Sequence, residues 1–131
     1  MNVHEAIQAA ERILPGTPAS SGNQDPRWQA IIAVGEHIED SPEQVWQFTV
    51  RWGSHPDPDL RNAVATCLLE HLLEYHFELL FPRVEKAAMA EPLFADTFLS
   101  CWQFGEPDKK SKRMRELAEA CQKRLIDLGL E

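Results

Sequence analysis

Asp57-Pro58-Asp59-Leu60 begins the longest apolar run of the chain, and similar starts occur at Asp25-Pro26-Arg27-Trp28 and Glu91-Pro92-Leu93-Phe94. In each start an acidic residue stands at the N-cap position and proline takes the first helical position, where its missing N–H costs nothing. The three prolines are 32 and 34 residues apart along the chain. A period in this range is typical of stacked helical repeats, so we expect an all-α protein whose helices stack in an array.

The three helices that follow these prolines carry similar residues at similar positions. Large residues that fill the layer between helices, and a small residue at a close crossing, are what stacked helices need. We therefore expect these positions to pack between the helices. The positions two, six and nine residues after each proline hold, in order, Trp28, Leu60 and Phe94; Ile32, Val64 and Phe98; and Gly35, Cys67 and Cys101.

Two further signals concern where helices begin and end. Ser41-Pro42-Glu43-Gln44 has the pattern of a capping box, and it predicts a helix that Gly53 closes. Pro82 disfavours helical geometry at Phe81, which predicts a break or kink near Phe77–Phe81. Because no segment alternates with a period of two, we expect about seven helices and no strand.

The chain is short enough to form one domain with one core. Gly129 is suited to close the last helix as a C-cap. We expect a single all-helical domain over residues 1–131, with 1–14 as an N-terminal capping helix, 15–25 as a flexible connector, 26–104 as the repeats and 107–129 as a C-terminal capping helix.

Trp52–Leu73 (WGSHPDPDLRNAVATCLLEHLL) resembles the turn and second helix of a repeat from the HEAT/armadillo class. Asp57, Leu60 and Arg61 stand where that class keeps its Asp…Val/Leu-Arg pattern. The resemblance covers residues 26–104, about two and a half units. It implies a right-handed α-α superhelix, a short HEAT-like array whose surface binds a partner.

Charge is unevenly distributed along the chain. Residues 1–108 hold 17 acidic and 6 basic side chains, for a net charge of −11, whereas residues 109–131 hold 4 acidic and 7 basic side chains, for +3. An acidic body repels phosphate backbones and attracts basic partners. The charge therefore argues against nucleic acid on the main face. We interpret the basic segment Lys109–Arg115 as a solvated face that pairs with the acidic body.

Composition also bears on where the protein works. The chain contains no membrane-spanning apolar stretch and no signal-peptide pattern at its N-terminus, so we expect a cytoplasmic protein. Cys67, Cys101 and Cys121 show no metal-ligand spacing and fall on the apolar stripes of their helices. We expect all three to pack in the core as free thiols.

Residues 70–78 are the densest cluster of metal-ligand residue types. His71 and Glu74 form an i, i+3 pair, and Glu78 lies one turn further on. Di-metal carboxylate bundles need a Glu-x-x-His motif from each of two helices, and this chain has no second one. A solvated acidic face is the favoured interpretation, with a metal site at His71, Glu74 and Glu78 as the alternative. No catalytic motif occurs, so we expect no enzymatic activity and no cofactor.

The side of the central helix that faces away from its apolar stripe carries polar and acidic residues, and its neighbours offer equivalent positions. An exposed tryptophan beside acidic residues would make a good binding hot spot, and Trp46 and Trp52 lie nearly opposite each other on one short helix. The candidate binding residues are Gln29, Glu36, Trp46, Trp52, Asp59, Asn62, Thr66, Glu70, Glu74, Asp96 and Gln103.

These patterns favour a non-enzymatic module that binds a basic partner protein. One form of this hypothesis is an immunity or antitoxin-type inhibitor, since small acidic proteins neutralise cationic toxins by charge complementarity. Two alternatives stay open: a HEAT-like nucleic-acid-binding or DNA-repair-related protein, and a metal-binding helical protein. The sequence leaves the identity of the partner and the oligomeric state undetermined.

Overall fold

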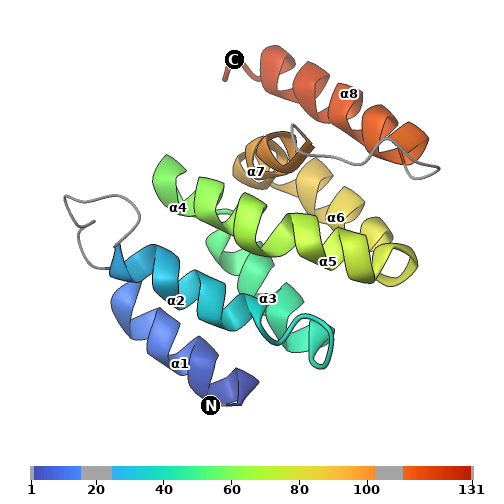
Figure 1. The fold of residues 1–131 in the computed structure, drawn as a ribbon. Helices are drawn as coiled ribbons and strands as arrows, with labels where there is room; N and C mark the ends of the chain where they lie inside the picture. The colour runs from blue at the N-terminus through green and yellow to red at the C-terminus, as the bar shows by residue number, and fades with distance from the viewer. Residues whose placement is uncertain (1, 16–24, 103–110, 131) are drawn as a thin grey trace.

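The computed structural model describes residues 2–15, 25–102 and 111–130, and every regular element in them is a helix (Figure 1). The predicted all-α class is therefore confirmed over the described residues. Most of the predicted connector and candidate residue Gln103 lie outside them. The elements are α1 (Val3–Ile13), α2 (Pro26–Gly35), α3 (Pro42–Trp52), α4 (Pro58–Val64), the π-helical segment η2 (Ala65–Leu69), α5 (Glu70–Tyr75), α6 (Phe77–Ala90), α7 (Pro92–Trp102) and α8 (Ser111–Asp127).

The elements α4, η2 and α5 follow one another without a gap and form one helix, the Pro58–Tyr75 helix. With it, the described residues contain seven helices, as expected. The π-helical turn in its middle was not predicted. Such turns insert one residue into an α-helix and shift the faces that its two halves present.

Two of the acidic-Pro starts cap their helices as predicted. The Oδ1 atom of Asp25 accepts a hydrogen bond of 2.8 Å from the backbone N–H of Arg27. The Oδ1 atom of Asp57 accepts one of 2.9 Å from the backbone N–H of Asp59. Each bond satisfies one of the N–H groups that a helix start leaves without an intrahelical partner.

The predicted capping box at Ser41 is wrong in its details, although α3 begins where expected. Ser41 has φ −136° and ψ 55°, outside the extended region, and its side chain makes no capping bond. The neighbouring Glu43 carboxylate, which is not the N3 residue of the box, accepts a 2.7 Å bond from Arg83 of α6. A capping box does form at the start of α1, between Asn2 and Glu5.

The predicted break near Phe77–Phe81 occurs at His76, one residue before that range. This residue has φ −135° and ψ 44° and separates α5 from α6, whereas Pro82 lies inside α6. The buried face of α6, which includes Phe77 and Phe81, outweighs the local cost of the proline. The ring Nε2 of His76 lies 2.9 Å from the carbonyl oxygen of Ile38, a contact that holds the break against the α2–α3 turn.

The helices pack around one core, with the Pro58–Tyr75 helix at its centre (Figure 1). The Pro58–Tyr75 helix lies between α2 and α7, with α1 on the far side of α2 and α8 on the far side of α7. The helices α3 and α6 pack against the Pro58–Tyr75 helix from behind in this view. The largest fully buried side chains are Phe48, Phe94, Phe98, Leu14, Ile31, Leu60, Leu68, Leu69, Leu72, Leu80, Val34 and Val45.

The predicted packing of the overlaid residues is confirmed at most positions, with Trp28 and Cys67 half-buried against the core. Gly35 lets α2 approach the π-helical segment closely, because a Cβ atom there would lie 3.1 Å from the carbonyl oxygen of Cys67. Ile32 is the exception. It is 44% exposed instead of buried, because it lies on the outer side of α2, away from Ile31 and Val34 in the core. Leu60, Phe94, Val64, Phe98 and Cys101 are all buried.

Arginines join the three acidic-Pro helices in order. The Nη2 atom of Arg27 in α2 lies 2.9 Å from Oδ2 of Asp57 at the start of α4. The Nη2 atom of Arg61 in α4 lies 3.0 Å from Oδ2 of Asp96 in α7. Arg27 is only 3% exposed, so its charge depends on Asp57 and the more distant Asp59 for its balance.

The sequence predicted no membrane-spanning stretch. None of the helices in the described residues has the length and apolar character needed to cross a membrane.

Candidate functional site

Seven of the candidate residues lie on two helices that pack side by side, α2 with its C-cap residue Glu36 and the Pro58–Tyr75 helix. Five of the seven are exposed, including Asp59 at the start of α4. Thr66 and Glu70 are half-buried. We call this set the acidic face. Its members are Gln29, Glu36, Asp59, Asn62, Thr66, Glu70 and Glu74.

Two candidate aspartates have structural partners. Oδ2 of Asp59 lies 3.4 Å from Nη2 of Arg27 and accepts a 3.2 Å bond from Nε1 of Trp28. Asp96 faces Arg61, as described above. Since each carboxylate lies against a guanidinium, both contribute less net charge to the surface than an isolated aspartate would.

Asp57 belongs to the same network. Partial burial raises the pKa of its carboxyl, but bonds from the Arg27 guanidinium and from backbone N–H groups outweigh burial, so the pKa lies below its ordinary value. Asp57 therefore stays ionised and balances a buried arginine.

The tryptophan candidates do not form an exposed anchor. Trp46 is 8% exposed and packs edge-on against Phe94, with ring centroids 5.9 Å apart, so it belongs to the core and the expectation that it forms part of the surface is wrong. Trp52 is half-buried and stacks on His55, with centroids 5.5 Å apart. The short helix α3 is covered by its neighbours on both sides, which helical spacing alone does not reveal.

The three weak metal candidates are divided between different partners. Nδ1 of His71 lies 3.3 Å from Oε1 of Glu74 on the surface of α5. Glu78 lies on α6 and accepts a 3.3 Å bond from Nη1 of Arg113. Over the part of the chain that the structure describes, no three His, Cys, Asp or Glu side chains are placed to hold a metal ion.

The thiols lie where the apolar stripes predicted. Cys101 and Cys121 are buried and Cys67 is half-buried, and all three are free. Burial raises the pKa of Cys67 and of Cys101, and raises that of Cys121 to about 11. Such thiols remain protonated at neutral pH and are poor nucleophiles.

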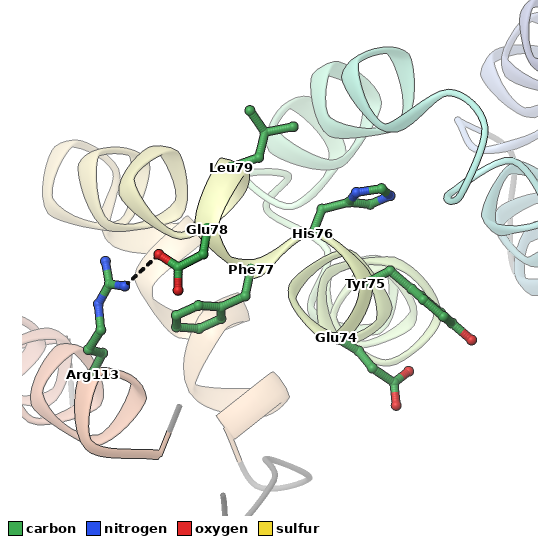
Figure 2. A pocket seen from close by; sticks show the side chains of 7 residues that line it. All are labelled: Glu74, Tyr75, His76, Phe77, Glu78, Leu79 and Arg113. Atoms are coloured by element: carbon green, nitrogen blue, oxygen red, sulfur yellow. Dashed lines mark hydrogen bonds and ion pairs between the residues drawn. The ribbon is translucent and has the colours of Figure 1, made fainter. Parts of the chain in front are cut away.

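A pocket that the sequence did not predict lies where α5 ends and α6 begins, and Figure 2 shows its lining. We call it the junction pocket. It is open to solvent, with a volume of about 640 Å³. Tyr75 is 55% exposed and Leu79 46% exposed at its rim. Its lining residues are Glu74, Tyr75, His76, Phe77, Glu78, Leu79 and Arg113.

Arg113 reaches the junction pocket from α8. Its guanidinium carbon lies 5.2 Å from the ring centroid of Phe77 and 4.8 Å from that of Phe81. In Figure 2 the same guanidinium faces the carboxylate of Glu78. The acidic cluster and the basic segment were both visible in the sequence, but their contact depends on how α8 packs on α6 and α7, which no local pattern reports.

Comparison with known proteins places the chain in a family. No curated protein and no solved structure matches the chain significantly. A family model described as a family of unknown function (DUF6869) matches residues 17–121, most of the chain. The chain therefore belongs to the DUF6869 family.

Proposed function

We propose that this protein is a non-enzymatic binding module that captures a basic partner protein on the acidic face. The observation that carries the proposal is the row of exposed and half-buried polar and acidic residues along α2 and the Pro58–Tyr75 helix, on a chain of net charge −8. Acidic surfaces attract cationic partners and accelerate their association. The residues Glu36, Glu70 and Glu74 give this face its acidic character.

We propose also that the helices form a short HEAT-like array. The order of α2, the Pro58–Tyr75 helix and α7, and the arginine that joins each to the next, support this arrangement. In an experimental structure, successive helix pairs of such an array would be related by similar rotations. Unrelated rotations would contradict the proposal.

A particular form of the binding proposal is an inhibitor of a cationic toxin, acting in the cytoplasm. The three free thiols agree with a reducing compartment. Co-expression tests this form: the protein would restore growth of cells that make the basic partner. Growth that stays inhibited despite complex formation would exclude the inhibitor role and leave the binding role intact.

Affinity capture with matched variants tests the binding proposal. The wild-type protein is compared with a variant in which Glu36, Glu70 and Glu74 are replaced by Gln. The control carries Glu85→Gln, Glu116→Gln and Glu119→Gln, which remove the same charge from exposed sites outside the acidic face. Each is used to capture proteins from source lysate, with stepwise salt elution.

We expect the wild type and the control to retain the same basic protein, released as salt rises, and the acidic-face variant to lose it. Equal retention by all three proteins would place the interaction elsewhere and contradict the proposal.

A further inference from the structure

We propose that the junction pocket receives an arginine side chain of the basic partner, in competition with the protein's own Arg113. The proposal rests on the function proposed above and names the contact that selects the partner. It starts from the fact that the pocket already holds one guanidinium, so its chemistry for such a group is visible in the structure.

The pocket offers an arginine both kinds of contact that it uses. The carboxylate of Glu78 accepts a hydrogen bond from Arg113. The guanidinium carbon of Arg113 lies over the ring of Phe77, which lines the pocket, and over the ring of Phe81, which is buried next to it in α6. A planar guanidinium stacks on aromatic faces and is weakly hydrated, whereas an ammonium is compact and strongly hydrated. The pocket should therefore prefer arginine to lysine.

Arg113 can leave the junction pocket while α8 stays folded and packed. Its side chain is about half-exposed, and its ion-pair partner Glu78 is more exposed still. The helix α8 is anchored by other residues, Met114, Leu117 and Cys121, which are buried. Arg113 can therefore rotate into solvent while α8 stays in place. The exposed rim residue Tyr75 and the carboxylate of Glu74 lie across the pocket from Arg113 (Figure 2).

The chain contains a single tyrosine, and it lies at this pocket. Protein made with 3-fluorotyrosine would therefore give one ¹⁹F NMR signal, which comes from the rim of the pocket beside Glu74. The probe ligands are a hexa-arginine peptide and a hexa-lysine peptide of equal charge. Fluorescence anisotropy of labelled peptides measures total binding in parallel.

We expect hexa-arginine to shift the ¹⁹F signal to saturation and to bind more tightly than hexa-lysine. Glu78→Gln should weaken hexa-arginine binding about two- to fivefold, as for a partly exposed ion pair and cation–π contact. Glu85→Gln, which removes an exposed carboxylate from the same helix α6, should leave the affinity within error.

The competition is tested with Arg113→Ala against Lys112→Ala, two adjacent exposed cations of α8. If Arg113 occupies the site, its removal should tighten hexa-arginine binding about two- to fivefold, whereas removal of Lys112 should change it much less. Equal effects of the two variants would mean that general charge governs binding, and would overturn the competition.

Different outcomes contradict the arginine pocket and the acidic face. Peptide binding that leaves the ¹⁹F signal unmoved, or equal affinity for the two peptides, would overturn the arginine pocket while the acidic face could still capture a partner. Absence of any peptide binding would also overturn the pocket. The proposed function would then stand or fall on the lysate capture with its own variants.

Discussion

Arg27 shows how a single residue ties two helices together. Its side chain is almost wholly buried, and a charge in such a place requires an opposite charge at hydrogen-bond distance. Asp57 supplies that charge at 2.9 Å, and Asp59 lies further away at 3.4 Å. Since Asp57 also caps α4, one carboxylate fixes both the start of its own helix and the position of the preceding one.

Substitutions at Asp57 separate these two roles. Asp57→Asn keeps an N-cap side chain but removes the charge opposite Arg27, and we expect it to lower the free energy of unfolding by about 1–3 kcal/mol. Asp57→Ala also removes the cap and should cost about 1 kcal/mol more. Asp59→Asn, at a more exposed site, should cost about 0–1 kcal/mol. Urea unfolding followed by circular dichroism measures all three, and a loss at Asp59 larger than that at Asp57 would contradict this ranking.

The carboxyl of Asp57 should make the free energy of unfolding depend on pH in the acidic range. Because its pKa in the folded protein lies below its ordinary value of 3.8, the stability it contributes is fully present above that value. That stability is lost as the pH falls through the lower, folded-state pKa. Unfolding measured from about pH 5 to about pH 2 should show a smaller acid loss in Asp57→Asn than in the wild type. Parallel curves for the two proteins would show that Asp57 is not the linked group.

At the scale of the helices, two glycines allow close approaches of unequal tightness. A Cβ atom on Gly53 would lie 2.9 Å from Cε1 of Phe94, and the Gly53 carbonyl also accepts a bond from buried Thr97. At Gly35 the nearest atom would be the Cys67 carbonyl oxygen at 3.1 Å. The α3–α7 contact at Gly53 therefore has less room for a methyl group than the contact at Gly35.

We expect Gly53→Ala to lower the free energy of unfolding by about 1–3 kcal/mol through overpacking against Phe94. Gly35→Ala gains up to about 1 kcal/mol of helix propensity, which offsets much of its tighter packing, so its net effect should be smaller. Thermal and urea unfolding of the two variants provide the comparison. A larger loss at Gly35 than at Gly53 would be inconsistent with these contacts.

Helix existence and starting points were largely predictable, whereas exact terminations were not. Acidic-Pro starts are local signals, and Asp25 and Asp57 act as they predict. The end of α5 depends on tertiary packing instead, because His76 contacts the distant Ile38 while the buried face of α6 tolerates Pro82. The π-helical turn at Ala65–Leu69 likewise has no local sequence signal.

At the scale of the whole molecule, the sequence predicted the helical class and the polar side of the central helix. It did not predict which charged side chains form ion pairs. Arg27 stands earlier in its helix than Arg61 does, so the spacing did not reveal that both join successive helices. The burial of Trp46 and the contact of Arg113 with Glu78 also arise only when distant helices pack.

The acidic body predicts that partner binding depends on salt. Screening shortens the range of electrostatic attraction from about 10 Å at 0.1 M to about 3 Å at 1 M salt. We expect the association rate with the captured partner to fall steeply over this range, while the dissociation rate changes less. Surface plasmon resonance at several ionic strengths measures both rates. A salt-independent association rate would show that the acidic face does not guide the encounter.

The most direct test of the acidic face is carboxylate footprinting of the complex with the captured partner. Solvent-accessible carboxylates, including the half-buried Glu70, are coupled to glycine ethyl ester with carbodiimide, with and without the partner, and labelling is quantified by mass spectrometry. The account predicts that Glu36, Glu70 and Glu74 lose labelling in the complex while Glu85, Glu116 and Glu119 keep it. Protection of the second set with unchanged labelling of the first would contradict it.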